Sequence, residues 1–151
     1  MSSPFRLNTQ QLAMYMLKDP YIREQFGGVL ALDQLQFTTF KPKIYIVNTD
    51  PHNEPGQHWF CLYISDTPEH FDPVGNAPLF SVNNFLILNG PNYLYNSKRV
   101  QSYVSETCGL FCLFYCYFRC RSFSFKEIMS MFSNNLKLNE AIVIYFYENT
   151  K

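Results

Sequence analysis

The sequence predicts one α+β domain spanning residues 1–151, with a central mixed sheet packed against a long apolar helix. Three observations support this prediction. A chain of 151 residues suits a single hydrophobic core. Hydrophobic residues make up 47% of the chain and charged residues 16%, which is typical of a packed globular protein and not of a disordered one. No repeat, low-complexity tract or linker divides the chain, which favours one α+β domain.

The chain begins with a helix-like segment at residues 9–18. Thr9 is a candidate N-cap, the leucine and methionine residues fall near one face, and Asp19-Pro20 ends the pattern. Gly27-Gly28 predicts a turn, and residues 32–35 predict a short helical piece.

Three strands are predicted in the middle of the chain. Residues 43–48 are rich in β-branched and aromatic side chains and run into a turn-forming stretch at 48–56. Residues 57–65 combine aromatic and branched side chains and predict a second strand. A turn at 66–68 leads into a short third strand at 69–72, so the last two strands predict a hairpin.

The rest of the chain is predicted to be mostly helical. A helix at 81–89 should end before Gly90, and residues 99–101 predict a short strand. Residues 108–121 predict a buried helix, because neither proline nor any glycine after Gly109 interrupts an apolar run.

Two further segments complete the helical part. Ser124 and Glu127 have the spacing of a capping box, which predicts a helix at 124–132. The last segment, 139–148, fits a helix capped by Asn139. Its Ile, Val, Tyr and Phe residues suit a strand nearly as well, so both interpretations stay open.

The charge balance and the absence of sorting patterns restrict the function classes. Twelve basic and twelve acidic residues exclude a strongly basic nucleic-acid-binding protein. A local basic patch at Lys41, Lys43, Lys98 and Arg99 stays an alternative, with solvated surface positions as the simpler interpretation. The N-terminus has no signal-peptide pattern and no apolar run reaches 18 residues, so neither secretion nor a membrane span is expected.

The chain has five cysteines: Cys61, Cys108, Cys112, Cys116 and Cys120. An odd number without a secretory signal predicts free thiols in a reducing compartment. The last four recur every four residues and would form one stripe on a helix. No metal site is expected, because no histidine accompanies them, and small buried core residues are the simpler interpretation.

Cys108 is the candidate nucleophile. The thiolate is the form that attacks a carbonyl, and the positive end of a helix dipole favours the thiolate at the start of the helix 108–121. Gly109, as a weak candidate for substrate binding, would let a substrate backbone approach closely. Taken alone, a cysteine in this context is more often a buried core residue.

His58 and Asp72 are the candidate general base and its orienting acid. His58 starts an apolar strand, and Trp59 can pack behind it and limit water access, which makes Trp59 a second weak substrate-binding candidate. Asp72 ends the neighbouring strand, and side chains on adjacent strands lie about 5 Å apart, within reach of an imidazole N–H. Taken singly, His58 suits a structural histidine and Asp72 a turn with Pro73. His70 shares a strand face with Asp72 and is expected to be exposed.

Gln101 is the candidate side-chain donor of an oxyanion hole. Its amide can donate to a developing oxyanion together with the backbone N–H of Cys108. A lone glutamine means little, and the weight of Gln101 comes from its position seven residues before a Cys-Gly pair.

As a set, these residues resemble adenain, the adenovirus maturation protease, and its relatives in Maverick/Polinton mobile elements and adintoviruses. The order His, acid, Gln, Cys also matches the related SUMO-deconjugating proteases. The resemblance covers about residues 20–120 and is carried by Ile46-Val47-Asn48-Thr49, Gln57-His58-Trp59, Phe71-Asp72-Pro73-Val74-Gly75, Gln101 and Cys108-Gly109-Leu110-Phe111-Cys112. It implies a papain-like, adenain-like fold with Cys108 as nucleophile, His58 as base, Asp72 as orienting acid and Gln101 in the oxyanion hole.

The sequence departs from adenain at positions that bear on activation. Asp72 stands where adenoviral enzymes have Glu, as it does in SUMO proteases. The chain is also shorter at its C-terminal end. The resemblance implies activation by a viral peptide or by DNA. No cysteine lies between Asp72 and Gln101 to bond such a peptide, and the neutral charge does not favour DNA. No cofactor is expected.

The sequence and the resemblance together predict a monomeric cysteine endopeptidase that processes capsid or core precursor proteins at glycine-containing sites. It would act in the virion and in the nucleus or cytoplasm of the host cell. One alternative keeps the chemistry but assigns it to SUMO or ubiquitin-like deconjugation. Another is an inactive protease domain kept as a binding module.

Overall fold

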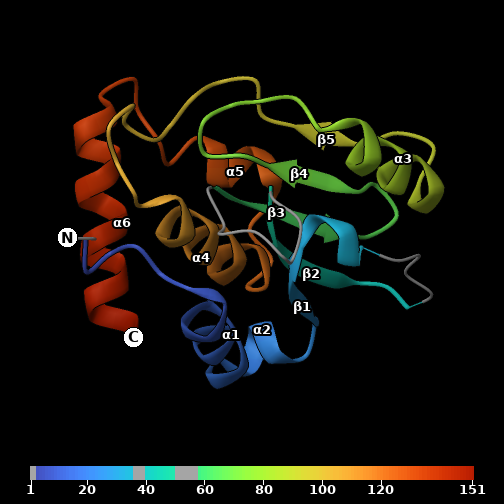
Figure 1. Cartoon of the computed structure of the whole chain (residues 1–151), viewed down its shortest axis with the longest axis horizontal. Coiled ribbons are helices and arrows are strands. Elements are labelled where there is room, and N and C mark those ends of the chain that lie inside the picture. The colour runs from blue at the N-terminus through green and yellow to red at the C-terminus, as the bar shows by residue number, and fades with distance from the viewer. Residues whose placement is uncertain (1–2, 36–39, 50–57) are drawn as a thin grey trace.

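A mixed five-stranded sheet forms the centre of the structure, a computed structural model that describes residues 3–35, 40–49 and 58–151 (Figure 1). The strands lie side by side in chain order, with β1/β2 and β4/β5 parallel and β2/β3 and β3/β4 antiparallel. The predicted mixed sheet and the β3–β4 hairpin are therefore confirmed. The strands are β1 Phe26–Ala31, β2 Lys43–Asn48, β3 Trp59–Ile64, β4 Glu69–Phe71 and β5 Leu94–Tyr95.

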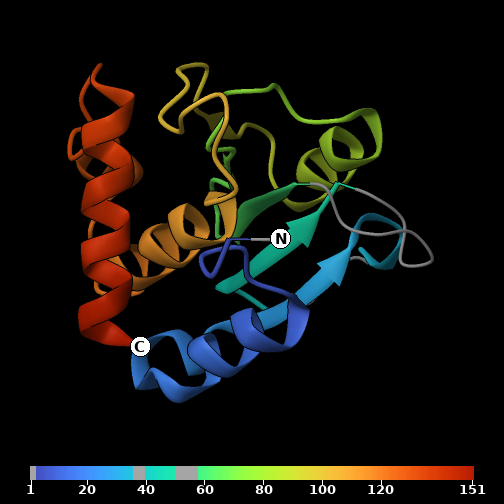
Figure 2. The same cartoon turned by 60° about the vertical axis from the view of Figure 1, so that its left-hand side comes forward.

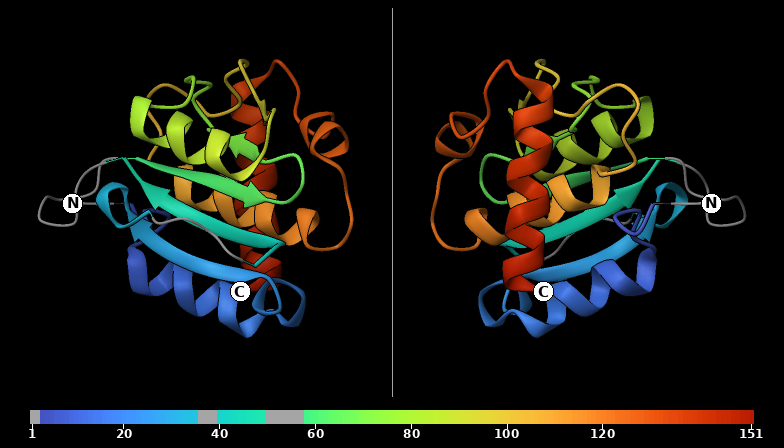
Figure 3. Two further views of the ribbon diagram at one scale, coloured as in Figure 1. Left: turned by 90° about the vertical axis from the view of Figure 1, so that its right-hand side faces the viewer. Right: turned by 90° about the vertical axis from the view of Figure 1, so that its left-hand side faces the viewer.

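The helices cover both faces of this sheet (Figure 3). One face packs against α4, with α1 beside that helix and α6 outside it, whereas α3 covers the opposite face. Within the described ranges, no helix is long and apolar enough to cross a membrane. The helices are α1 Thr9–Lys18, α2 Pro20–Arg23, the 3-10 helix η1 Leu32–Gln34, α3 Phe80–Asn89, α4 Cys108–Arg119, α5 Phe125–Met129 and α6 Leu136–Thr150.

Strand β3 shows why the sequence pattern here is apolar throughout. Trp59, Cys61 and Tyr63 belong to the core shared with α4, while Phe60, Leu62 and Ile64 belong to the core shared with α3. All six residues are buried, because both faces of the sheet are covered. His58 immediately precedes this central strand.

Most predicted helices are confirmed, with corrected ends. Asn8, not Thr9, caps α1 through a capping box. Ser124 caps α5: its Oγ accepts the Glu127 N–H at 3.1 Å, and its own N–H donates to Glu127 Oε1 at 2.9 Å. The last segment is the helix α6, which Asn135 caps, so Asn139 lies inside the helix and not at its start.

Two local predictions are wrong. Gly27-Gly28 lies within strand β1 and not in a turn, because a Cβ on Gly27 would lie 2.4 Å from the Tyr45 ring. A glycine here lets the aromatic ring of the neighbouring strand cross β1. Residues 99–101 form no strand, and the edge strand is β5, Leu94–Tyr95, instead.

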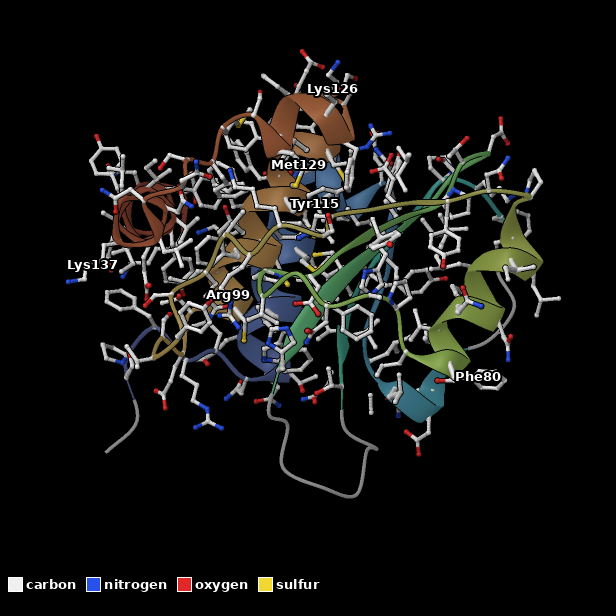
Figure 4. All side chains as sticks on the ribbon, turned by 90° about the horizontal axis from the view of Figure 1, so that it is seen from above. Phe80, Arg99, Tyr115, Lys126, Met129 and Lys137 are labelled. Carbon is white, nitrogen blue, oxygen red and sulfur yellow. The ribbon has the colours of Figure 1, made fainter. Side chains whose placement is uncertain are left out.

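A buried ion pair fixes helix α4 against strand β4. Arg119 at the end of α4 donates to both carboxylate oxygens of Glu69, with Nε–Oε1 at 2.9 Å and Nη2–Oε2 at 2.9 Å. The hydroxyl of Tyr115, which Figure 4 labels, donates to the same carboxylate. Glu69 begins β4 and Cys108 begins α4, so this contact holds the cysteine helix against the strand that leads to Asp72.

We expect Glu69→Gln to destabilise the fold strongly. The side chain of Glu69 is 4% exposed, and removing its charge leaves the Arg119 guanidinium facing an uncharged amide in a largely buried place. Breaking a buried pair of this kind costs about 3 kcal/mol. Urea unfolding measures the loss, with Glu148→Gln in an exposed pair on α6 as the matched control. A change no larger than that of the control would contradict this account.

Candidate active site

The antiparallel pairing of β3 and β4 brings His58 and Asp72 together. His58 immediately precedes β3 and Asp72 immediately follows β4, so both stand at the same end of the sheet. His58 Nε2 lies 2.6 Å from Asp72 Oδ1, and the side chains are only 17% and 5% exposed. The carboxylate therefore holds one ring nitrogen of the imidazole and leaves Nδ1 for another partner.

Cys108, the first residue of α4, lines the same cavity as His58, and its side chain interacts with the imidazole. Burial lowers the pKa of His58, but hydrogen bonds and charge interactions with Asp72 and Cys108 outweigh burial and raise it to about 9. The imidazole is therefore held in its protonated form at neutral pH, beside the sulfur.

These groups open into one cleft. A cavity of about 240 Å³ is lined on one side by the predicted site residues and on the other by two residues that precede α1. The lining residues are Arg6, Leu7, His58, Trp59, Gln101, Ser105, Glu106 and Cys108. Asp72 lies behind His58, outside the lining, so it can act on a bound molecule only through the imidazole.

The turn after β4 is tied to the segment that carries Gln101. The carbonyl of Pro73 accepts the N–H groups of Val100 at 2.9 Å and Gln101 at 3.0 Å. Gly75 has a φ of +80° and faces the backbone of Arg99, where a Cβ would lie 2.9 Å from the amide nitrogen. A glycine is required there, and the close approach fixes the Gln101 segment relative to Asp72.

Asn96 is a site residue that the sequence reasoning missed. It is 5% exposed, and its Oδ1 accepts the Asp72 N–H at 2.9 Å while its Nδ2 donates to the Asp72 carbonyl at 2.6 Å. The side-chain amide thus clamps the backbone of Asp72 from both sides. Asn96 directly follows the two-residue strand β5. The sequence analysis did not predict this strand, so no pattern in the sequence indicated a role for Asn96.

Gln101 lies in a polar network that reaches helix α6. Its Nε2 donates to the Ser105 carbonyl at 3.1 Å, and the Ser105 and Thr107 hydroxyls are hydrogen-bonded to each other. The Thr107 hydroxyl donates onward to Glu140 Oε1 at 3.0 Å. Thr107 is the N-cap residue of α4 but makes no side-chain cap bond. The first N–H groups of α4, beginning with that of Cys108, are therefore not satisfied by their N-cap side chain.

The structure places the two weak substrate-binding candidates differently. Trp59 lines the cleft, is 9% exposed, and donates its Nε1–H to the Leu7 carbonyl at 3.2 Å. Gly109 is buried and does not line the cleft: a Cβ there would lie 3.3 Å from Leu12 Cδ2 and 3.6 Å from Leu7 Cβ. Gly109 lets α1 and the preceding segment pack against α4.

His70 is buried, not exposed as the strand pattern suggested. It is 2% exposed, contacts the Phe60 ring on the α3 side of the sheet, and burial lowers its pKa to about 4. Its Nδ1 has no hydrogen-bond partner within the described part of the chain. His70 and Asp72 share one face of the sheet, and on this face the side chain of His70 is buried in the core under α3.

The remaining cysteines pack inside the core. All five cysteines are free and buried, and the sulfur of Cys61 lies 3.8 Å from that of Cys116. Burial raises the pKa values of Cys61, Cys112 and Cys120, which disfavours their thiolates. In the described ranges, no three His, Cys, Asp or Glu side chains are grouped to hold a metal ion. Gln57 of the predicted histidine motif lies outside the described residues.

No family model matches the chain. In sequence, the chain is 32% identical over 125 residues to a protease of Bovine adenovirus 7. The chain is therefore similar in sequence to an adenovirus protease. The aligned region covers 68% of this chain and 62% of the relative, so the chain spans about three fifths of the length of the adenovirus protease.

Two solved structures of proteases have a similar fold. A crystal structure of an ASFV protease matches this chain with a TM-score of 0.59 at 16% identity, covering 93% of this chain and 68% of the other. A SUMO protease, Ulp1, with its catalytic cysteine oxidised to a sulfinic acid, matches with a TM-score of 0.50 at 14% identity over 83% of this chain and 73% of the other. The predicted α+β cysteine-protease fold and the resemblance are both confirmed.

We expect Asp72→Asn to lower the pKa of His58. A carboxylate beside the ring favours the imidazolium, so removing its charge leaves burial, which favours the neutral ring. Titration of isotope-labelled histidines by NMR should show His58 near pH 9 in the wild type and at least about one unit lower in the variant. Asp66→Asn, in an exposed turn, is the control. An unchanged His58 titration would refute the assigned role of Asp72.

The same shift fixes the sign of a pH effect on stability. The pKa of His58 is higher in the folded chain than its ordinary value of 6.5. Protonation of His58 therefore stabilises the fold below about pH 6.5, and this contribution is lost as the pH rises through 9.

Proposed function

We propose that the chain is a cysteine endopeptidase that cleaves proteins at glycine-containing sites. The observation that carries the proposal is the position of His58, which is bonded to Asp72 through Nε2 and lines the same cavity as Cys108. A thiol, a protonatable imidazole and an orienting carboxylate in one cleft are the parts that acyl transfer by a thiol requires. The kinship with a Bovine adenovirus 7 protease supports the same reaction.

In the proposed mechanism, the Cys108 thiolate attacks the scissile carbonyl while His58 holds the thiol proton. His58 then gives this proton to the departing amine, which leaves an acyl group on sulfur. A water molecule, deprotonated by His58, hydrolyses the thioester and regenerates the thiol. Asp72 keeps the ring oriented and favours the imidazolium throughout.

We propose that Gln101 and the Cys108 backbone N–H stabilise the oxyanion. Thr107 makes no side-chain cap bond, so its side chain satisfies none of the first N–H groups of α4, at the helix end that carries Cys108. Gln101 Nε2 carries two N–H groups, and one is held by the Ser105 carbonyl. The second is available to an oxyanion once its longer 3.4 Å contact with Ser105 Oγ is given up.

The size of the cleft supports a preference for glycine. Its volume of about 240 Å³ lies below the roughly 300–1,000 Å³ of ordinary small-molecule sites, and Trp59 forms a fixed aromatic wall. A substrate side chain beside the scissile bond would clash with that wall, whereas at a glycine the cleft has to accommodate only the substrate backbone. By resemblance to adenain, we propose capsid or core precursor proteins as substrates, in the virion and in the nucleus or cytoplasm of the host cell.

The proposed chemistry uses protein groups alone, so no cofactor is part of it. The resemblance implies activation by a peptide or by DNA. Such an activator would arrange the site residues and would not supply a reacting group. We propose that the monomer is the active form.

A panel of substrates tests this function. The purified chain is incubated with peptides containing Gly-Gly or Gly-X-Gly, with matched peptides in which each glycine is replaced by valine, and with ubiquitin-like proteins carrying a C-terminal electrophile. We expect cleavage of the glycine peptides only, blocked by one equivalent of a thiol alkylator that mass spectrometry locates on Cys108. Reaction with the ubiquitin-like probes alone would assign a deconjugase instead. Reaction with none of them would favour an inactive binding module.

A further inference from the structure

The segment before α1, residues 3–7, borders the candidate active site without contributing a catalytic group. Two of its residues, Arg6 and Leu7, line the same cleft as Cys108 and His58. Figure 2 shows this coil, in dark blue, passing the N-terminal end of α4. The segment therefore forms part of the cleft wall, together with Gln101, Ser105 and Glu106 of the loop 101–107.

The segment has an ordered backbone of its own. The Arg6 N–H donates to the Ser3 carbonyl at 3.1 Å, and the Phe5 N–H donates to Ser3 Oγ at 3.1 Å. This turn, with Pro4 at its second position, presents the Arg6 side chain toward the cleft. Leu7 is 4% exposed, and its carbonyl accepts the Trp59 N–H, which seats the end of the segment on the cleft floor.

Glu106, two residues before Cys108, holds the other end of the segment. Its Oε2 accepts the Ser3 N–H at 3.1 Å, and its Oε1 lies 3.5 Å from Arg6 Nη1. Both oxygens of this carboxylate are thus directed at the segment, across roughly a hundred residues of chain. The side chains of Arg6 and Glu106 are 46% and 42% exposed, so the pair stands at the rim of the cleft and not in the core.

We propose that Glu106 is a positioning residue for substrate binding: with Arg6 and the Ser3 N–H it forms a clasp that holds residues 3–7 as one wall of the peptide groove. This inference rests on the proposed protease function and names how the same site grips its substrate. An extended peptide at Cys108 has to pass between this wall and the loop 101–107, so opening the clasp widens the groove and weakens binding. The thiol–imidazole pair does not contact the clasp oxygens, so its reactivity stays the same.

The clasp predicts a separation of two reactions at Cys108. A glycine-containing peptide that ends in an electrophile reports both groove binding and thiol reactivity, whereas iodoacetamide reports reactivity alone. In Glu106→Gln and in Arg6→Ala, we expect the half-saturating concentration of the peptide electrophile to rise about fivefold, the scale of an exposed ion pair. The iodoacetamide rate should stay within twofold of the wild type. Glu148→Gln, which breaks a pair of similar exposure on α6, should change neither.

The combined charge reversal, Arg6→Glu with Glu106→Arg, makes the test specific. We expect it to recover part of the affinity lost in the single variants, because the ion pair is rebuilt with opposite polarity while the Ser3 N–H loses its acceptor. Single variants that leave the peptide electrophile unaffected would overturn the clasp. So would a double variant that shows no recovery, since each charge would then act on the substrate separately. A wild-type chain that reacts no faster with the peptide electrophile than with iodoacetamide would instead contradict the protease function itself.

Discussion

Replacing Cys108 with alanine is expected to abolish peptide cleavage, with kcat/KM falling by roughly 10³-fold or more. The reason is that no other thiol lines the cleft: Cys61, Cys112 and Cys116 are fully buried, and burial raises the pKa values of Cys61, Cys112 and Cys120. The fold should survive, because the change removes one sulfur atom from a cleft wall. Cleavage of a Gly-Gly peptide measures the loss, and circular dichroism checks the fold.

Cys112→Ala is the matched control for this variant. It removes the same atom one helical turn further along α4, where it is buried in the core. We expect lower stability with kcat/KM within a few fold of the wild type. Cleavage that persists in folded Cys108→Ala protein would show that the sulfur is not the nucleophile.

Replacing His58 with alanine is expected to lower kcat by roughly 10³-fold, because the leaving amine loses its proton donor. The vacated ring space adjoins a cleft of about 240 Å³, so added imidazole can enter it. We therefore expect millimolar imidazole to restore part of the activity, on the scale of about tenfold. Steady-state cleavage assays with and without imidazole measure both effects.

His70→Phe provides the control for His58. His70 packs against Phe60 on the face of the sheet that α3 covers, and no step of the proposed mechanism uses it. The variant should retain kcat within about threefold and should not respond to imidazole. If it instead behaves like His58→Ala, the effect is structural and the base is misassigned.

The contact between His58 and Asp72 could be predicted from the sequence because it follows from sheet topology. A short hairpin places the residue before β3 next to the residue after β4, so the positions of His58 and Asp72 alone imply their contact. A cysteine before a long apolar helix is equally local information. Only the resemblance to adenain predicted that the start of the helix with Cys108 lies at the end of the sheet that carries His58.

The supporting residues could not be predicted in the same way. Asn96 follows a two-residue edge strand, and a strand this short shows no alternation of side chains in the sequence. Asn139 seemed to be a helix cap, but in the structure it lies within α6, fully buried, and donates to the Val100 carbonyl at 3.1 Å. Its role is to hold the segment before Gln101, a contact between residues 39 positions apart.

Residues 3–7 and Gly27 show a related limit. Neither a coil before the first helix nor a Gly-Gly pair has a pattern that distinguishes turn from close packing. Gly27 is required by the Tyr45 ring on the next strand, and residues 3–7 are ordered by Glu106 and Trp59 from distant parts of the chain. Tertiary contacts, not local preference, decide both.

The pairing of Cys108 with His58 is tested most directly by the pH dependence of alkylation at Cys108. Rates with iodoacetamide are measured from pH 5 to pH 10 in the wild type and in His58→Ala, and mass spectrometry assigns the modified residue. A protonated imidazole beside the sulfur should sustain rapid alkylation of the wild type between pH 5 and pH 7, and the variant should react at least about tenfold more slowly in that range. Superimposable profiles for the two proteins would contradict the pairing.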